Sequence, residues 1–146
     1  TAKLAKTLSS VTGADLFEIK PVTPYTSKDL DWMDKKSRST IEMQDKASRP
    51  EMAEKLSSCA QYDTVFVGFP IWWYEAPHII ETFLESCDLS GKTVVPFGTS
   101  GGSSMGKTAQ ILAPSCPGAK VLSGKVLRAS SSEADVKAWV DSLHLA

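Results

Sequence analysis

The sequence has few of the residues from which metal sites and disulfide frameworks are built. Its three cysteines, Cys59, Cys87 and Cys116, include no CxxC pair, which argues against a zinc site and against a disulfide scaffold. The two histidines, His78 and His144, are far apart, and neither has a cysteine or a second histidine at ligand spacing. We therefore expect no metal site.

Long apolar runs and a strong charge of either sign are also missing. No run reaches the ~20 residues that would cross a bilayer. The net charge of −1 over 146 residues gives neither a basic footprint for nucleic acid nor a strongly negative surface that would steer the protein to a partner. The first residues, 1–11, have a helical pattern rather than that of a signal peptide. We expect a cytoplasmic protein that binds neither nucleic acid nor membrane.

Apolar segments of strand and helix type alternate along the chain. Residues 64–69 and 92–97 are apolar at successive positions, which is typical of strands buried on both faces of a parallel sheet. A short strand is expected at 16–19, and a last one across 121–127, broken at Gly124. Helices are expected at 1–11, 51–60, 77–86, from the glycine-rich loop to about 113, and 133–143. This alternation predicts a single α/β domain, residues 1–146, with helices on both faces of the sheet.

Residues 21–50 are the least regular part of the sequence. A turn or two of helix is expected at 29–33, and the remainder reads as a long excursion over the surface, a feature that is more often functional than idle. Cys59 and Cys87 are expected to be buried thiols. His78, at the start of a helix, is expected at the surface, and Cys116, between two prolines, is expected to be exposed.

The loop after the first buried strand, residues 70–77, has three consecutive aromatic side chains. Ligands of open α/β sheets bind at the carboxyl ends of the strands, where this loop lies. At least one of the rings must point away from the core, because neighbours in an extended segment face opposite ways. The loop is therefore a candidate stacking platform for a flat ligand. The alternative is that Trp72 and Trp73 only fill gaps between a helix and the sheet.

The loop after the second buried strand, residues 98–106, is rich in glycine and serine. Glycines allow the backbone to approach a ligand closely, and N–H groups ahead of a helix can bind an anion or a ring carbonyl. The alternative is a connector that binds nothing. Residues 101–108 also match GxxxxGK[ST], the phosphate-binding loop of nucleotidases. Against that match, no later apolar strand ends in an aspartate, and the aromatic loop would be left unexplained.

The two loops together resemble those of the flavodoxin family. The matching segments are Gly68 to Pro77, Phe83-Leu84, and Gly91 to Gly102. More narrowly, they resemble bacterial flavodoxin-like proteins with the patterns G-(Y/F)-P-I-W-W…A-P and P-F-x-T-S-G-G. Asp29 to Trp32, with 36–39 and 49–50, is similar to their long second loop, so the resemblance covers almost the whole chain.

The resemblance implies a flavodoxin-like three-layer sandwich, with a parallel sheet of strand order 2-1-3-4-5 and FMN at its edge. The isoalloxazine ring would lie between residues 70–74 and 99–102, with the aromatic side chains stacking on it and backbone groups of the second loop at its polar edge. The cofactor-binding residues implied are Thr1, Pro70, Ile71, Trp72, Trp73, Tyr74, Thr99, Ser100, Gly101 and Gly102.

One departure concerns the family's first strand and its T/S-x-T-G-x-T loop, which holds the FMN phosphate. Thr1 aligns with the final threonine of that loop, so the strand is absent from the 146 residues. A second departure is charge: classical flavodoxins are strongly acidic, and −1 is not.

The function implied is electron transfer, or NAD(P)H-dependent reduction of small acceptors such as quinones, with the flavin doing the chemistry and no catalytic side chain. The partner would be a redox protein or a small electron acceptor, and a homodimer is left open. The alternatives are a flavodoxin-fold binding module without redox activity and, less favoured, a P-loop nucleotide-binding protein.

Overall fold

The computed structural model describes residues 2–31, 33–45, 47–53, 62–71, 76–99, 108–128 and 131–143, and these contain one four-stranded parallel sheet. β1 (Thr64–Pro70) pairs with β2 (Thr93–Thr99) along its whole length, from Thr64 opposite Thr93 to Pro70 opposite Thr99. The other edge of β2 pairs first with β3 (Lys120–Val121) and then with β4 (Lys125–Leu127). The two buried strands and the interrupted last strand are thus confirmed.

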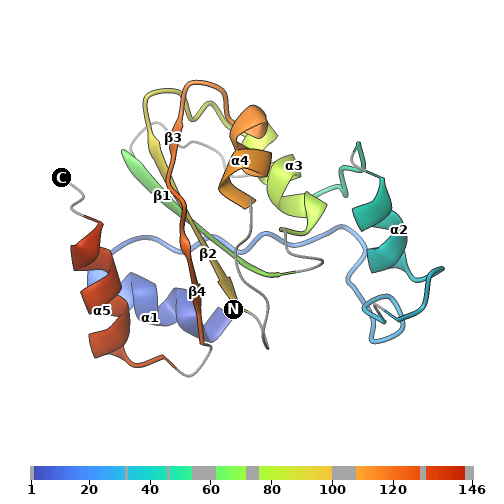
Figure 1. The fold of residues 1–146 in the computed structure, drawn as a ribbon, viewed down its shortest axis with the longest axis horizontal. Helices are drawn as coiled ribbons and strands as arrows, with labels where there is room; N and C mark the ends of the chain where they lie inside the picture. Colours follow the sequence, from blue (N-terminus) through green and yellow to red (C-terminus); the bar gives the residue numbers. More distant parts are fainter. Residues whose placement is uncertain are drawn as a thin grey trace.

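Helices cover both faces of this sheet (Figure 1). α1 (Ala2–Thr12) and α5 (Glu133–Ser142) lie on one face. α3 (His78–Ser86), α4 (Thr108–Leu112) and the short 3-10 helix η1 (Ala113–Ser115) lie on the other. The arrangement is the three-layer α/β sandwich that the sequence predicts.

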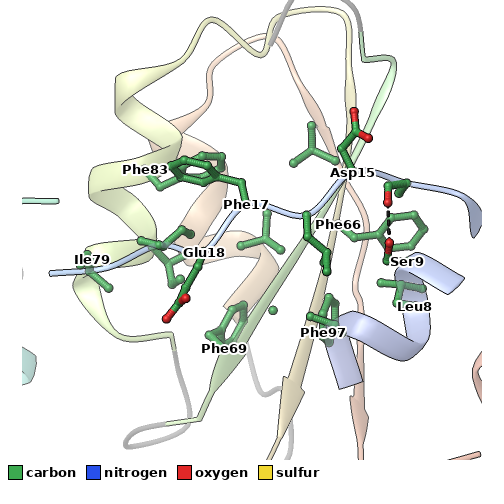
Figure 2. A pocket seen from close by; sticks show the side chains of 18 of the residues that line it. Leu8, Ser9, Asp15, Phe17, Glu18, Phe66, Phe69, Ile79, Phe83 and Phe97 are labelled. Carbon is green, nitrogen blue, oxygen red and sulfur yellow. Dashed lines mark hydrogen bonds between the residues drawn. The ribbon is translucent and has the colours of Figure 1, made fainter. Parts of the chain in front are cut away.

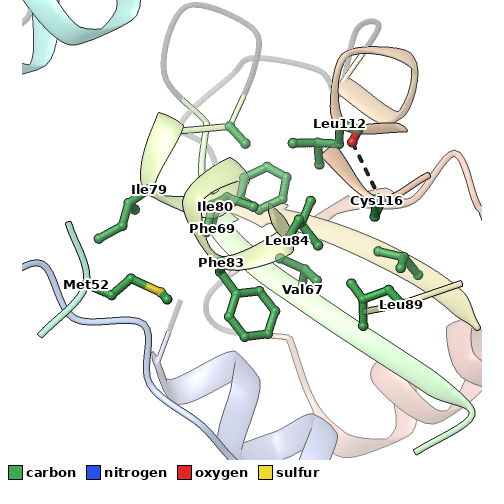
Figure 3. Close-up of a cluster of buried hydrophobic side chains, with 12 residues drawn as sticks. Met52, Val67, Phe69, Ile79, Ile80, Phe83, Leu84, Leu89, Leu112 and Cys116 are labelled. Carbon is green, nitrogen blue, oxygen red and sulfur yellow. Dashed lines mark hydrogen bonds between the residues drawn. The ribbon is translucent and has the colours of Figure 1, made fainter. Parts of the chain in front are cut away.

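Each face of the sheet has its own apolar core. The core under α3 and α4 includes Phe69, Leu84 and Val94 (Figure 3), and the core under α1 and α5 includes Val95 and Trp139. Val94 and Val95 are adjacent in β2, fully buried, and belong to opposite cores, as expected where neighbours along a strand face opposite ways. Successive apolar residues in β2 therefore reflect helices on both of its faces.

Glycine accounts for the break between β3 and β4. Gly124 has a φ of +75°, and a Cβ at this position would overlap the backbone carbonyl of Pro96. No other residue type fits this close approach of two backbones. Because the chain resumes beside β2 after the break, both short strands continue the same edge of the sheet.

The predicted strand at 16–19 is wrong. Residues 13–20 have no strand pairing, although Phe17 stacks on Phe83 of α3 with ring centroids 6.1 Å apart. Only the end of this segment pairs, where Pro21 and Met52 form an isolated antiparallel bridge. Between residues 14–19 and β1 lies a groove of ≈ 690 Å³ (Figure 2). The backbone at 16–19 forms no β-ladder because the groove separates it from β1, so that no strand lies within hydrogen-bonding distance.

The groove lies where the order 2-1-3-4-5 has its first strand, with 16–19 in place of the second strand and β1 in place of the third. Aromatic side chains from both of its sides line it. They are Phe17, Tyr25, Tyr62, Phe66, Phe69, Phe83 and Phe97. Its apolar lining and its position along the edge of β1 suit an extended segment that is itself buried on both faces.

The excursion at 21–50 is more regular than predicted. It contains α2 (Arg38–Gln44), whose first turn is capped by the Ser37 side chain accepting from the Thr40 N–H. The Tyr25 hydroxyl donates to Glu42, and the Arg38 guanidinium lies 3.9 Å from the centre of the Tyr25 ring. The pKa of Tyr25 is raised, mainly by burial and to a smaller extent by the hydrogen bond to Glu42. This cluster, joining residues distant in sequence, stabilises a segment that lacks clear apolar periodicity.

Two helix predictions need correction. Residues 29–31 and 33 form turns rather than helix. The helix predicted to begin at Glu51 does not begin there, because Met52 is in the bridge with Pro21. The remainder of that prediction, 54–60, falls outside the described residues.

Candidate functional site

The carboxyl ends of β1 and β2 meet at one edge of the sheet. Pro70 lies opposite Thr99 in the parallel register, and the next residue, Ile71, donates its N–H to the Thr99 carbonyl at 3.0 Å. The loop that follows β1 and the loop that follows β2 therefore leave the sheet side by side. The structure brings together three of the residues that the sequence singled out, Pro70, Ile71 and Thr99.

The other predicted cofactor-binding residues fall outside the described part of the chain, so their roles remain predictions. They are Thr1, Trp72, Trp73, Tyr74, Ser100, Gly101 and Gly102.

Close packing between the two strands holds this edge in register. A Cβ at Gly68 would overlap the ring of Phe97, so β1 carries a glycine where the side chain of β2 crosses it. Phe97 is buried and packs edge-on against Trp139 with centroids 6.2 Å apart. Pro70, two residues after Gly68, is exposed, and Thr99 is partly buried. The strands are thus rigidly packed up to the point where the loops begin.

α3 follows the loop that leaves β1, and its first residue is a histidine that the sequence places at the surface. This histidine holds the start of the helix. His78, the first residue of α3, is only 2% exposed, which corrects that expectation. Its Nδ1 lies 2.5 Å from Oγ of Ser48, at the end of the excursion. The excursion covers this side of α3, and no local pattern around His78 could indicate that a segment 30 residues upstream does so.

An ion-pair cluster lies next to this contact. Arg49 places Nη2 3.2 Å from Oε2 of Glu81, which is buried, and Nε 2.9 Å from Oε1 of Glu85. The hydrogen bond from Arg49 lowers the pKa of Glu85, and a hydrogen bond from Ser115 acts in the same direction. The sequence could have indicated this cluster through Glu81 and Glu85. They are four positions apart on a predicted helix, so their carboxylates lie on one face.

The large groove meets this edge at Pro70 and extends away from it along the strand. It runs beside β1 between residues 14–19 and α3, and its charged lining residues are Lys6, Asp15 and Glu18. Its lining is mainly apolar and its three charged side chains are of mixed sign, so it offers no concentration of positive charge for a flavin phosphate. The candidate cofactor site is therefore the carboxyl edge of the sheet and not the body of this groove.

No metal centre is found in the part of the chain that the structure describes, where Cys87, expected to be buried, is partly exposed. No three His, Cys, Asp or Glu side chains gather there as metal ligands. Cys116, expected to be exposed, is only 2% exposed, its Sγ lies 3.7 Å from the Leu112 carbonyl, and burial raises its pKa. Among the described helices none has the length and apolar character to cross a membrane.

Comparison with known proteins adds independent support. The family model for flavodoxin matches residues 1–143. No protein of curated function matches. A solved candidate flavoprotein from Bacteroides eggerthii DSM 20697 is 46% identical, with a TM-score of 0.90 over 100% of this chain and 91% of its own. A second, from Bacteroides uniformis ATCC 8492, is 45% identical, with a TM-score of 0.88 over 97% and 90% of the two chains.

A more distant structure shares the fold. The flavoprotein from Lactobacillus acidophilus NCFM, solved in complex with FMN, is 22% identical, with a TM-score of 0.61 over 95% of this chain and 89% of its own. The match of the family model over nearly the whole chain agrees with the parallel sheet, the two helical layers and the loops that meet at its carboxyl edge. The chain belongs to the flavodoxin family.

Proposed function

We propose that this protein binds FMN at the carboxyl edge of β1 and β2 and acts as a redox protein. It would either pass electrons to a partner protein or use NAD(P)H to reduce small acceptors such as quinones. The observation that carries the proposal is the junction at which Ile71 donates to Thr99, because it starts both candidate ring loops side by side. The FMN bound to the Lactobacillus acidophilus flavoprotein, which has the same fold, supports the choice of ligand.

The described residues fit such a site. The edge offers an exposed proline and a partly buried threonine at the ends of two packed strands, with a close backbone approach and no charged side chain among Pro70, Ile71 and Thr99. Trp72, Trp73 and Tyr74 would stack on the ring and keep water from it. Backbone groups of Thr99 to Gly102 would bind its polar edge, and Thr1 would lie at the phosphate end.

Bound FMN would supply the electron or hydride chemistry. The chain would hold the ring between two loops and set its polarity, and no side chain is proposed to act as an acid or base. With a net charge of −1 the protein has little long-range field, so we infer partner recognition by local contacts rather than by steering. We place it in the cytoplasm, and a homodimer is compatible with the site.

Titration with FMN tests the proposal. FMN should quench the tryptophan fluorescence of the purified protein, and the complex should lose its visible flavin absorbance under dithionite and regain it in air. Absence of both quenching and bound flavin would contradict the proposal. Bound flavin that cannot be reduced and reoxidised would favour a binding module without redox activity.

The variant Lys107→Ala separates the proposal from nucleotide binding through the GxxxxGK[ST] match. A P-loop protein should lose ATP or GTP binding on this change, since that lysine contacts the phosphates. The FMN site should be affected little, because the lysine lies beyond residues 99–102.

A further inference from the structure

The end of the excursion is joined to α3 by two neighbouring side chains. The Ser48 hydroxyl donates to the Glu42 carbonyl at 2.7 Å and also contacts Nδ1 of His78 at 2.5 Å. Arg49 donates to Glu85 and contacts Glu81 one turn closer to the start of the helix. Side chains at three positions along α3, those of His78, Glu81 and Glu85, are thus bound to residues 48–49.

The hydrogen-bond partners of Ser48 favour one tautomer of the histidine. A serine hydroxyl has one hydrogen, and a carbonyl oxygen can only accept. If that hydrogen goes to the Glu42 carbonyl, then Oγ must accept from His78, so Nδ1 carries a hydrogen and donates it. An asparagine at position 78 could present an amide N–H near the same place, whereas a leucine could not.

The residue before α3 does not cap the helix with its own side chain. Its N-cap is Pro77, which makes no side-chain capping bond and lacks an N–H. A serine, threonine or aspartate normally satisfies the first free N–H groups of a helix. Here the first helical residue, His78, is instead buried and bonded to Ser48. The contact with the excursion therefore contributes to fixing the position at which α3 begins.

Pro77 and His78 also form the downstream end of the loop that leaves β1 at Ile71. The upstream end of that loop is fixed by the bond from Ile71 to Thr99. Glu85 extends the same cluster to η1 by accepting from Ser115 at 3.0 Å, and η1 follows α4, the helix after the second loop. The cluster is thus in contact with α3, which follows the first of these loops, and with η1, which follows α4.

We propose that the Ser48–His78 hydrogen bond anchors the downstream end of loop 71–77, and that His78 is a positioning residue for the flavin ring. The effect on the flavin rests on the proposed function, while the anchor itself does not. The competing interpretation is a histidine that only fills the core, for which the identity of its polar partner makes no difference to the loop.

The first experiment uses the flavin-free protein and hydrogen exchange. His78→Leu should speed exchange of the amides of residue 76 and residues 78–80 about tenfold, the equivalent of one net hydrogen bond. His78→Asn, which keeps a donor for Ser48, should stay within about threefold of the wild type. Equal exchange at 76–80 in wild type and His78→Leu would overturn the anchor, as would equal acceleration throughout the chain.

The second experiment measures the dissociation constant for FMN by tryptophan quenching. His78→Leu should weaken binding about tenfold, and His78→Asn should restore most of the loss. The matched control is Ser132→Ala, which removes the capping serine of α5 on the opposite face. It should lower the thermal midpoint without changing the FMN affinity.

The outcomes separate the two proposals. If the wild type binds no FMN, the proposed function fails, and the exchange experiment still decides the anchor. If His78→Leu speeds exchange at 76–80 but binds FMN as the wild type does, the anchor exists and His78 does not position the flavin. If His78→Leu does not fold, Ser48→Ala, at a partly buried position, tests the same bond with the same expected results.

Discussion

The two edges of β1 differ sharply. On one edge all seven residues pair with β2, from Thr64 to Pro70, and the last pair places two loops side by side. On the other edge there is a groove of ≈ 690 Å³, and no described strand pairs with β1 there. The contrast shows that an apolar strand fixes the position of neighbouring segments only along the edge where another strand pairs with it. The paired edge positions the candidate cofactor site, and along the open edge the apolar lining of the groove has no described strand over it.

The largest expected effect comes from filling the open edge. We expect a chain extended before Thr1 by an apolar strand of about seven residues, the length of β1, and a T/S-x-T-G-x-T loop to place that strand in the groove. In Figure 1 the start of α1 lies near the carboxyl end of β2, so a strand parallel to β1 could continue into α1 through a short loop. The unfolding free energy in urea should rise by about 5 kcal/mol, because several buried side chains and a new ladder outweigh the ordering entropy.

A matched control carries aspartate at two central positions of the added strand. It should give no gain, since both faces of the groove are apolar and an unpaired buried charge is costly. If the two extensions stabilise the protein equally, or neither does, the groove does not receive a strand.

A second pair of variants compares a side chain in the packed core with a side chain that borders the groove. Leu84→Ala should lower the unfolding free energy by about 3 kcal/mol, because Leu84 is fully buried in the core under α3 and its removal leaves a cavity. Phe17→Ala should cost only about 1 kcal/mol, because Phe17 is partly buried and already borders the groove. Urea denaturation of both variants checks the difference, and equal losses would mean that the open edge is as well packed as the core.

The smallest effect concerns pH and the cluster on α3. The pKa of Glu85 is lowered in the folded protein, first by the hydrogen bond from Arg49. Its pairing therefore stabilises the protein above the ordinary value of 4.5 and is lost as the pH falls through the lowered pKa. Glu85→Gln should cost under about 1 kcal/mol at neutral pH, because the pair is partly exposed, and this difference should shrink in acid.

Thermal unfolding between neutral and acidic pH measures the effect of Glu85→Gln. Glu18→Gln is the control, since Glu18 is exposed and its contact with Lys20 is 3.8 Å long. A constant difference between wild type and Glu85→Gln across this pH range would contradict the proposed contribution of the pair.

The sequence predicted the parts of the fold that depend on local pattern. The continuous apolar runs of β1 and β2, the amphipathic pattern of α5 and the glycine at the break before β4 each have a local physical cause. The strand prediction at Leu16 to Ile19 was wrong because a strand needs a neighbouring strand to pair with as well as an apolar pattern. α2 was missed because its stability depends on contacts such as Tyr25 with Glu42 rather than on periodicity.

The candidate site was predictable to the same extent. The register between Pro70 and Thr99 follows from two parallel strands whose loops leave the same edge, so the sequence could indicate where the loops meet. The burial of His78 could not be predicted, because a segment distant in sequence covers it. The burial of Cys116 could not be predicted either, because the prolines on both sides of it do not define the path of the turn. The contact between Ser48 and His78 belongs to this second kind.

A crystal structure of the protein with FMN tests the central claim most directly. The account predicts that the isoalloxazine lies between residues 70–74 and 99–102, at the edge where Ile71 meets Thr99. Flavin bound along the open edge of β1, against Phe17 and Phe66, would contradict it.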